Sequence, residues 1–349
     1  MALSGGGTAG HVNPIIAIAK YLQAEGVELL YLGTKGIEKQ LVGNQIKYQT
    51  ILAGKLNRYF SFSTIVNLAK LKIGFFQALW HLIKFQPDII FAKGGFVSLP
   101  VVLASRVLGI PLVAHESDVE MGISNKIALR FCQKMCLGFP VENYLNIDLN
   151  KAVFTATPAN SLINRYKVDY NFFGFEKSKP VIFITGGSQG AKSLNEKIME
   201  ILPGSLAKYQ IIFQTGAHRL GIDQNTQGVW QKDFLNDEQI AKAYATADLI
   251  LSRAGASALA DISASQKPAI LFPLPWSAGD HQAKNARVFE KAGAAVVLRQ
   301  EKISGQKIAI AIKNILENPE KRKAMSQAVS QFDEPQSAQK IANEILKLL

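Results

Sequence analysis

The stretch SGGGTAGHVNP, from Ser4 to Pro14, says most about how this chain folds. A short apolar run, Met1 to Ser4, precedes it, and a helical pattern over Pro14–Ala24 follows it. Glycines allow a tight turn and a close approach of the backbone to a ligand. A helix start behind them offers unpaired N–H groups and the positive end of a dipole, which suit phosphate. The stretch therefore predicts a strand, an anion-binding turn and a helix.

A similar stretch, ITGGSQGAKSLN, runs from Ile184 to Asn195 in the second half of the chain. It has the same order of apolar strand, glycine-rich turn and helix. One such loop is a weak signal. Two of them, about half a chain apart, predict two similar nucleotide-binding domains that face one cleft.

The first loop also satisfies the dinucleotide fingerprint G-x-G-x-x-G through Gly5, Gly7 and Gly10. That fingerprint needs an acid at the end of the next strand to hold a ribose. The next strand, Val27–Leu32, ends in Gly33-Thr34-Lys35 without an acid, which argues against an oxidoreductase. A simple turn would not require a histidine directly after the last glycine, so His11 is a candidate functional residue.

The composition is that of a two-domain globular protein: 349 residues, 48% hydrophobic and 19% charged, with a formal net charge of +12. A positive net charge favours anionic partners. The sequence contains no nucleic-acid-binding motif, so nucleic acid is not expected among them. Cys132 and Cys136 are expected to be buried thiols in a reducing compartment, because no second pair completes a zinc site. We find no signal peptide, and prolines and an arginine interrupt the most apolar stretch, Phe96–Ala114, so it cannot span a membrane.

Strand and helix patterns alternate along both halves, which predicts α/β domains with parallel sheets covered on both faces. Strands are expected in the first half at Val27–Leu32, Tyr48–Leu52, Asp88–Ala92, Leu112–His115, Lys134–Leu137 and Ala152–Thr155, and in the second at Val181–Thr185, Tyr209–Gln214, Leu249–Leu251, Ala269–Phe272 and Ala295–Leu298. We expect an N-terminal domain over 1–157 and a C-terminal domain over 158–334. A last amphipathic helix over 335–349 is expected to pack back on the first domain.

Ligands of open α/β sheets bind beyond the carboxyl ends of the strands. The segments at such ends are therefore expected to line the ligand site. Besides the two glycine loops they are Lys93-Gly94-Gly95, His115–Asp118, Ser252–Gly255 and Gly279–Gln282.

Several of these segments together resemble one known family. The ordered set is GGGTAGHVNP, FAKGGFVSLPVV (Phe91–Val102), GIPLVAHESD (Gly109–Asp118), GISNK (Gly122–Lys126), GGSQGAKSLN, SRAGA (Ser252–Ala256) and DHQAKNA (Asp280–Ala286). The chain is similar, from residue 1 to about residue 300, to the MurG family of N-acetylglucosaminyltransferases, which make lipid II from lipid I in peptidoglycan synthesis. The resemblance implies the GT-B fold, with two Rossmann-like parallel-sheet domains facing an interdomain cleft.

The resemblance also implies the reaction. GlcNAc is moved from UDP-GlcNAc to the C4 hydroxyl of the MurNAc sugar on undecaprenyl pyrophosphate, with inversion at the transferred sugar. The implied enzyme is a peripheral protein of the cytoplasmic face of the cell membrane, with UDP-GlcNAc, lipid I and an anionic membrane surface as partners, and it needs no cofactor. No Asp-x-Asp motif lies at a strand end, so we expect metal-independent catalysis. Backbone N–H groups of Ser188-Gln189-Gly190 are expected to stabilise the leaving diphosphate.

The family's donor site maps onto residues of the second half. Uracil is expected against Phe234 and the Leu235 backbone, and the ribose hydroxyls at Asp261, where the family usually has Glu. The donor sugar is expected near His281, Gln282 and Asn285. Without the resemblance, Phe234 could equally be a core residue, and the polar cluster could be a simple helix cap.

The remaining site residues lie mostly in the first half. His11 is the leading candidate for the base that activates the acceptor hydroxyl, and Glu116 ranks second, although it could equally be a structural carboxylate that accepts loop N–H bonds. Four further residues complete the expected UDP-GlcNAc-binding set: Thr8, Gly10, Asn125 and Asn160. The family commonly has an arginine near Asn160.

The helical segment Ser63–Phe85 is apolar over most of its circumference. Its polar residues Lys70, Gly74, Gln77, His81 and Lys84 form one narrow stripe. A helix buried on one side needs only a stripe of about 100° of apolar residues. The excess predicts either burial under neighbouring loops or docking on a bilayer, with apolar and basic residues between Lys55 and Phe62 alongside. The residues expected to dock are Ile73, Phe76, Leu79, Trp80 and Lys84.

Two other readings of the sequence stay open. Another UDP-sugar enzyme with the same fold, such as a glycolipid transferase or an epimerase, would share the glycine loops. A non-catalytic scaffold that binds UDP-sugars would be consistent with the departures at Asn160 and Asp261.

Overall fold

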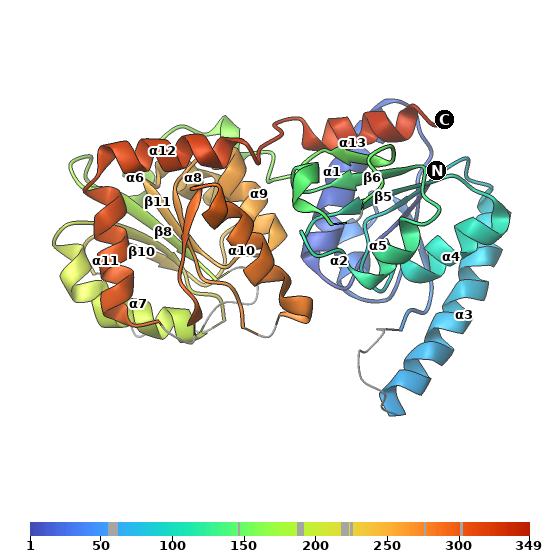
Figure 1. The fold of residues 1–349 in the computed structure, drawn as a ribbon, viewed down its shortest axis with the longest axis horizontal. Helices are drawn as coiled ribbons and strands as arrows, with labels where there is room; N and C mark the ends of the chain where they lie inside the picture. The colour runs from blue at the N-terminus through green and yellow to red at the C-terminus, as the bar shows by residue number, and fades with distance from the viewer. Residues whose placement is uncertain are drawn as a thin grey trace. The chain divides into compact units, whose positions relative to one another are not determined.

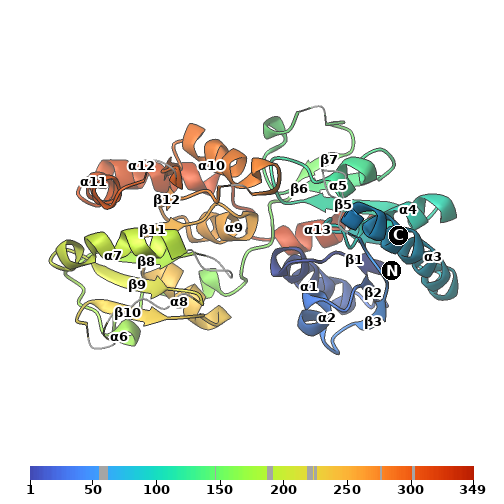
Figure 2. The ribbon, with the colours of Figure 1, turned by 90° about the horizontal axis from the view of Figure 1, so that it is seen from below.

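A computed structural model of the chain describes residues 1–54, 62–145, 147–186, 192–217, 223, 226–275, 277–300 and 303–349. They form two compact units, Met1–Pro158 with Gln336–Leu349, and Ala159–Pro335. Each unit contains one sheet with helices on both of its faces (Figures 1 and 2). The chain leaves the first unit after Pro158 and returns to it at Gln336.

The first unit is built on a seven-stranded sheet in the order β3-β2-β1-β4-β5-β6-β7, with every neighbouring pair parallel. Its strands are β1 (Ala2–Ser4), β2 (Leu30–Gly33), β3 (Lys47–Thr50), β4 (Ile90–Ala92), β5 (Leu112–Glu116), β6 (Lys134–Leu137) and β7 (Ala152–Phe154). Ser4 pairs with Leu32 on one side and with Ala92 on the other. The loops after β1 and β4 therefore leave the sheet side by side, where the strand order reverses.

The second unit repeats this plan with six parallel strands in the order β10-β9-β8-β11-β12-β13. They are β8 (Val181–Thr185), β9 (Gln210–Gln214), β10 (Val229–Lys232), β11 (Leu249–Ser252), β12 (Ala269–Leu271) and β13 (Ala295–Val297). Strand β10 was not predicted from the sequence. Its residues are half-buried or exposed at the edge of the sheet, so it lacks the continuous apolar run of its neighbours.

The helices of the first unit are α1 (Ala9–Ala24), α2 (Ile37–Val42), α3 (Phe62–Phe85), α4 (Leu99–Leu108), α5 (Ile123–Ala128) and α13 (Ser337–Leu346). Helix α1 begins at Ala9 and not at Pro14, so His11 lies within its first turn. The prediction of a start at Pro14 was wrong because α1 continues through this proline, which lies inside the helix and donates no hydrogen bond to the carbonyl four residues earlier. Helix α13 packs against α1, and its Ile341 and Ile345 belong to the core of the first unit.

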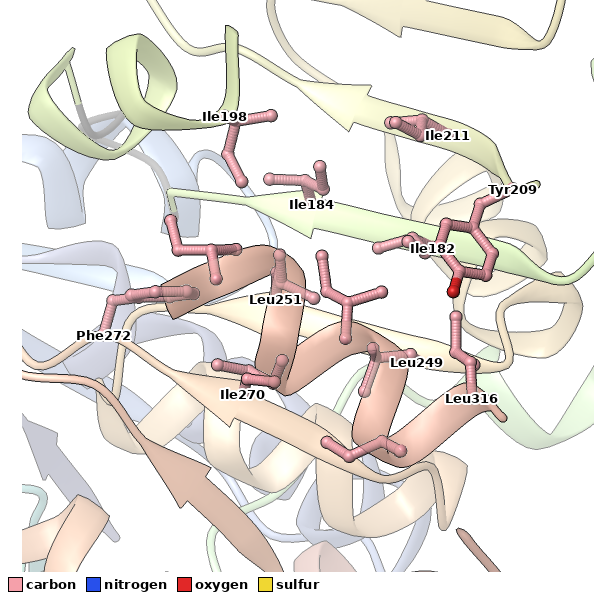
Figure 3. Close-up of a cluster of buried hydrophobic side chains, with 14 of the residues drawn as sticks. Ile182, Ile184, Ile198, Tyr209, Ile211, Leu249, Leu251, Ile270, Phe272 and Leu316 are labelled. Carbon is pink, nitrogen blue, oxygen red and sulfur yellow. The ribbon is translucent and has the colours of Figure 1, made fainter. Parts of the chain in front are cut away.

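The helices of the second unit are α6 (Tyr170–Phe173), α7 (Lys192–Leu206), α8 (Asp237–Thr246), α9 (Ala256–Ser265), α10 (His281–Lys291), α11 (Gly305–Leu316) and α12 (Pro319–Ser330). Short 3₁₀ turns lie at Ile163–Arg165 and Ala278–Asp280 in this unit, and at Val141–Asn143 in the first unit. Figure 3 shows aliphatic side chains of β8, β9, β11 and β12 meeting Ile198 of α7 and Leu316 of α11. This core fixes the strands whose ends carry the donor-site candidates.

Helix α3 runs along the edge of the first unit on α4 (Figure 1). Gly74, Ala78 and Leu82 on its inward side are buried, and Gln77 accepts the Leu52 N–H at 2.7 Å through Oε1. A Cβ on Gly74 would lie 1.7 Å from the carbonyl oxygen of Leu52. The middle of the expected polar stripe therefore faces the protein and not water.

Many of the large apolar side chains of α3 point outward instead. We call Ile65, Leu68, Ile73, Phe76, Trp80 and Ile83 the outer face of α3; Phe76 is 66% exposed and Trp80 58%. Leu79 is half-buried, and the exposed Lys84 places its ammonium 5.3 Å from the centre of the Trp80 ring. Residues 55–61, which include other docking candidates, lie outside the described residues. Among the helices that the structure describes, none has the length and apolar character needed to cross a bilayer.

Candidate active site

The glycine-containing loops after β1 and β4 meet at the carboxyl edge of the first sheet. A Cβ on Gly95 would lie 2.6 Å from the carbonyl oxygen of Gly6, so the loops after β4 and β1 touch. Gly7 has φ +87°, and a Cβ there would collide with the ring of Phe96. Glycine is required at these positions because both the space and the left-handed backbone exclude a side chain.

A buried carboxylate that the sequence analysis missed supports the first of these loops. Glu38, at the start of α2, accepts the Thr34 N–H at 2.9 Å, the Thr34 hydroxyl, and the Gly7 N–H at 3.4 Å. The tyrosine hydroxyl of Tyr31 donates to the Gly5 carbonyl at 2.7 Å. The sequence search for a ribose-binding acid stopped at Lys35, and Glu38 lies three residues further, where it binds the protein's own loop.

His11 lies in the first turn of α1, half-exposed, directly behind the first glycine loop. Its Nδ1 shares a hydrogen bond of 2.8 Å with the Thr8 hydroxyl. Thr8 is exposed and Gly10 half-buried beside them. The structure thus brings Thr8, Gly10 and His11 together at a helix N-terminus, with the imidazole orientation held by Thr8.

Glu116 organises the loop that follows β5. Its two carboxylate oxygens accept the N–H of Asp118 at 3.0 Å, the N–H of Gly122 at 2.8 Å and the amide of Asn125 at 3.0 Å. Burial raises the pKa of Glu116, and the three hydrogen bonds act in the opposite direction. The geometry is that of a structural carboxylate, which was one of the two alternatives for this residue.

Asn125 is buried beside Glu116 and beneath Gly94. Its side-chain amide also donates to the His115 carbonyl at 2.9 Å, while its Oδ1 has no hydrogen-bond partner among the described residues. A Cβ on Gly94 would lie 2.7 Å from the Asn125 amide nitrogen. Asn125 therefore joins the loops after β4 and β5 and offers one acceptor oxygen.

Lys93 is a buried cation that the sequence analysis noted only as part of a loop. It follows β4 directly, is 1% exposed, and its ammonium donates a hydrogen bond to the Ser117 hydroxyl. Burial lowers the pKa of Lys93 to about 8, although the nearby Glu116 and Asp118 favour its charged form. The sequence signal was a lysine placed between an apolar strand and two glycines.

In the second unit, the two positions that depart from the family pattern contact each other. The backbone N–H of Asn160 donates to Asp261 Oδ1 at 2.9 Å, and the Asn160 side chain donates to the Asp237 carbonyl at 3.0 Å. Burial raises the pKa of Asp261 to about 7, against the stabilising hydrogen bond from Asn160. One carboxylate oxygen of Asp261 is therefore already engaged by the backbone.

Phe234 and Leu235 follow the edge strand β10 and precede α8, whose start is capped by Asn236 and Gln239. Phe234 is 55% exposed, so it is not a core residue, whereas the Leu235 side chain is buried. An exposed aromatic ring held at a strand end by a buried neighbour and a capped helix can stack on a flat apolar ligand group.

The start of α10 joins the loops after β11 and β12. Gln282 accepts the Leu274 N–H at 3.0 Å, and the buried Asn285 donates to the Ala254 carbonyl at 3.3 Å. His281 and Gln282 are half-buried at the first turn. All three candidates for the donor sugar thus lie together, with Asn285 also holding the SRAGA loop.

Arg253 of the same SRAGA segment has a structural position. Its guanidinium is nearly buried and donates to the Phe272 carbonyl at 3.1 Å and to Gln300 at 2.8 Å. The Ser188-Gln189-Gly190 turn lies outside the described residues. Within the described part of the chain, no three His, Cys, Asp or Glu side chains gather in a way that could hold a metal ion.

Comparison with known families agrees with the two-unit architecture. Residues 1–137 match the N-terminal domain of glycosyltransferase family 28, and residues 181–344 match its C-terminal domain. Two parallel-sheet units that match the two domains of this family thus define a glycosyltransferase of the GT-B fold.

Two relatives carry the name UDP-N-acetylglucosamine--N-acetylmuramyl-(pentapeptide) pyrophosphoryl-undecaprenol N-acetylglucosamine transferase. The Clostridium novyi protein is 39% identical over 327 residues, covering 91% of each chain, and the Clostridium perfringens protein is 39% identical over 326 residues, covering 91% of this chain and 90% of its own. The crystal structure of Acinetobacter baumannii MurG is 27% identical, with a TM-score of 0.79 over 99% of both chains. The chain belongs to the MurG family.

Proposed function

We propose that this chain transfers GlcNAc from UDP-GlcNAc to the MurNAc C4 hydroxyl of undecaprenyl-pyrophosphoryl-MurNAc-pentapeptide, converting lipid I to lipid II. The observation that carries the proposal is the 39% identity over 91% of the chain to relatives named for this transfer. The retained glycine loops and the polar residues at the strand ends of both units support it.

His11 acts on the acceptor hydroxyl in this proposal. An inverting displacement needs a base within hydrogen-bond reach of the attacking hydroxyl. The Thr8 hydroxyl orients the imidazole at the first turn of α1. Glu116 contributes by shaping the neighbouring loop, since both of its oxygens already accept loop donors.

The donor is held by the second unit. Phe234 stacks on uracil, Asp261 accepts from the ribose, and His281, Gln282 and Asn285 surround the sugar. The exposed ring of Phe234 and the clustering of His281, Gln282 and Asn285 at the start of α10 support this assignment. The departing UDP is stabilised by N–H groups and a helix dipole in the glycine turn that includes Ser188.

The acceptor carries a lipid chain, so the proposed enzyme works at a membrane. The outer face of α3, with Lys84 beside Trp80, supplies apolar rings and a cation on one exposed surface. Such a surface suits the boundary of an anionic bilayer. We assign the cytoplasmic leaflet, because UDP-GlcNAc is a cytoplasmic nucleotide sugar.

The test is to incubate the protein with UDP-GlcNAc and a lipid I analogue and to measure the disaccharide product and UDP. Product formation distinguishes the proposal from an epimerase, which would release no disaccharide, and from a non-catalytic scaffold. His11→Ala should lower turnover by roughly 10²- to 10⁴-fold while UDP still binds. Asn13→Ala, an exposed change on the same helix, is the matched control and should stay near the native rate.

The same assay tests the expectation of metal independence. With excess chelator, we expect the rate to stay within about twofold of the untreated enzyme, because backbone N–H groups stabilise the leaving diphosphate. A complete loss of activity that Mg²⁺ restores would overturn this part of the proposal.

A further inference from the structure

One carbonyl oxygen joins strand β5 to both connections between the units. The buried His115 ring places Nε2 2.9 Å from the Ala156 carbonyl oxygen, and the Ser337 hydroxyl donates to the same oxygen at 3.2 Å. Ala156 lies two residues before the chain leaves the first unit, and Ser337 lies one residue after Gln336, where the chain returns. We call this contact the Ala156 tie.

A second contact lies beside the first. Ser117 accepts the Thr157 hydroxyl at 3.2 Å and also accepts the Lys93 ammonium. All three side chains are buried. Lys93 leads directly into the Gly94-Gly95 turn after β4, and a Cβ on Gly5 would lie 2.9 Å from the Lys93 Cβ. We call this contact the Ser117 tie. It connects Thr157 of the outgoing connection to Lys93, which lies beside the glycine turns after β1 and β4.

The two ties contact adjacent residues of the outgoing connection, Ala156 and Thr157, from His115 and Ser117 at the end of β5. Successive side chains of an extended strand point to opposite sides. His115 and Ser117 face the connection, whereas Glu116 between them faces the loop from Asp118 to Gly122 and accepts its N–H groups. A displacement of Glu116 consequently moves the partners of Ala156 and Thr157.

The backbone of the connection is strained at Ala156, whose carbonyl oxygen forms the first tie. Ala156 has φ +54°, a left-handed conformation that a residue with a side chain rarely adopts. Such a conformation persists where the surroundings determine it strongly. Thr155 N–H, hydrogen-bonded to the Leu137 carbonyl at 3.1 Å, anchors the segment just before it.

We propose that the Ala156 and Ser117 ties couple the Glu116 loop to the two connections between the units. Ordering of that loop by a bound acceptor then restricts the connections, and loosening of the connections loosens the loop. His115, Lys93 and Ser337 are positioning residues in this coupling. The coupling rests on the proposed function only for its effect on turnover.

Hydrogen exchange of the full chain tests the coupling without any substrate. The reporters are the loop amides of Asp118 and Gly122 and the connection amide of Thr155, all hydrogen-bonded in the structure. Ser337→Ala should speed exchange about fivefold both in the loop amides and in the connection amide. A fivefold change corresponds to the loss of about 1 kcal/mol, the net value of one hydrogen bond. Faster exchange in the connection alone would overturn the coupling, as would no change in either segment.

The matched control is Ser105→Ala, which removes an equally buried hydroxyl that donates to the Val102 carbonyl within α4. It should leave both segments unchanged; equal acceleration there would mean a general loss of stability. Lys93→Met is the second variant, because it keeps the side-chain length and removes the contact to Ser117. It should reproduce the effect of Ser337→Ala on both segments.

A kinetic measurement separates this inference from the proposed function. Ser337→Ala should lower kcat with a soluble acceptor about fivefold while KM for UDP-GlcNAc changes less than twofold, because the donor residues belong to the second unit. An unchanged kcat would overturn the link to turnover. If the native chain transfers no sugar but the exchange pattern holds, the proposed function fails and the coupling stands.

Discussion

At the scale of single residues, three acids of this chain serve loops at strand ends. Glu38 accepts N–H groups of Thr34 and Gly7, Glu116 accepts those of Asp118 and Gly122, and Asp261 accepts that of Asn160. Burial disfavours a charged carboxylate, and hydrogen bonds from N–H groups offset that cost. Asp261 accepts the Asn160 N–H at 2.9 Å, but burial outweighs this bond and raises the pKa of Asp261 to about 7.

Asp261 leads to a prediction about pH. Because its pKa is raised from 3.8 to about 7 in the folded chain, the folded state binds a proton that the unfolded state releases. The contribution of protonated Asp261 to the free energy of unfolding is therefore fully present below pH 4 and is lost as the pH rises to about 7. Relative to the native chain, Asp261→Asn should gain roughly 2–4 kcal/mol of unfolding free energy between pH 4 and pH 7, since one pKa unit is worth about 1.4 kcal/mol.

Urea titrations of the two proteins across this pH range measure the difference. Asp280→Asn is the control, because Asp280 is another acid of the second unit. Parallel stability profiles for the native chain and Asp261→Asn would show that Asp261 titrates at an ordinary pKa.

At the scale of elements, α3 shows how a helix can dock through its least apolar side. Gly74 and Ala78 let the helix approach Leu52 and α4 closely, and Gln77 satisfies a backbone N–H there. The large side chains of the outer face then remain exposed, because no element of the described first unit covers them. The close approach and the exposed outer face lead to separate predictions.

Gly74→Ala should destabilise the first unit. The added Cβ would lie 1.7 Å from the Leu52 carbonyl oxygen, so α3 must shift, at a cost of about 1–3 kcal/mol typical of overpacking. Gly204→Ala is the matched control, because Gly204 lies in α7 with no atom within 4 Å of an added Cβ. Thermal unfolding should show a lower Tm for Gly74→Ala and an equal or higher Tm for Gly204→Ala; the opposite order would refute the packing of α3.

Phe76→Ser with Trp80→Ser should weaken binding to vesicles that contain anionic lipid. These two rings make up much of the exposed outer face of α3, and their loss removes apolar area that would enter the bilayer. Ile310→Ser removes an exposed aliphatic side chain of α11 and should leave vesicle binding unchanged. Sedimentation with vesicles measures binding, and turnover of a water-soluble acceptor checks folding. Aggregation of the double variant would instead mean that the outer face is buried.

At the scale of the whole molecule, the first unit is assembled from both ends of the chain. Its core includes Ile341, Ala342 and Ile345 of α13 together with residues of β1, β2 and β4. Folding of the first unit therefore depends on the last 14 residues, although the complete second unit separates them from the rest.

A chain that ends after Pro335 should retain a folded second unit and a destabilised first unit. Each large aliphatic side chain removed from a core costs about 1.5–3 kcal/mol, so the loss should reach several kcal/mol. Leu349→Ser, at an exposed position, is the control. Hydrogen exchange should rise in peptides of β1 to β7 and stay unchanged in those of β8 to β13. Equal protection in both sheets would contradict the role of α13.

Local patterns along the chain were sufficient for the architecture. Apolar runs alternating with helical periods predicted parallel sheets in two units, and the glycines after Ser4 predicted a tight turn between strand β1 and helix α1. The ordered motifs predicted the family, and the comparisons confirmed it. These inferences succeed because periodicity and glycine requirements depend on residues close together in sequence.

Tertiary structure alone decided which partner each polar group found. Glu38 and Gly7 are 31 positions apart in the sequence, and Asn160 and Asp261 are 101 positions apart. The Ala156 carbonyl is contacted by His115, 41 positions away, and by Ser337, 181 positions away. The inward side of α3 was likewise set by contact with Leu52 and α4. The physical reason is that a buried hydrogen bond or a close helix contact depends on where the folded backbone brings distant residues together, which no local pattern records.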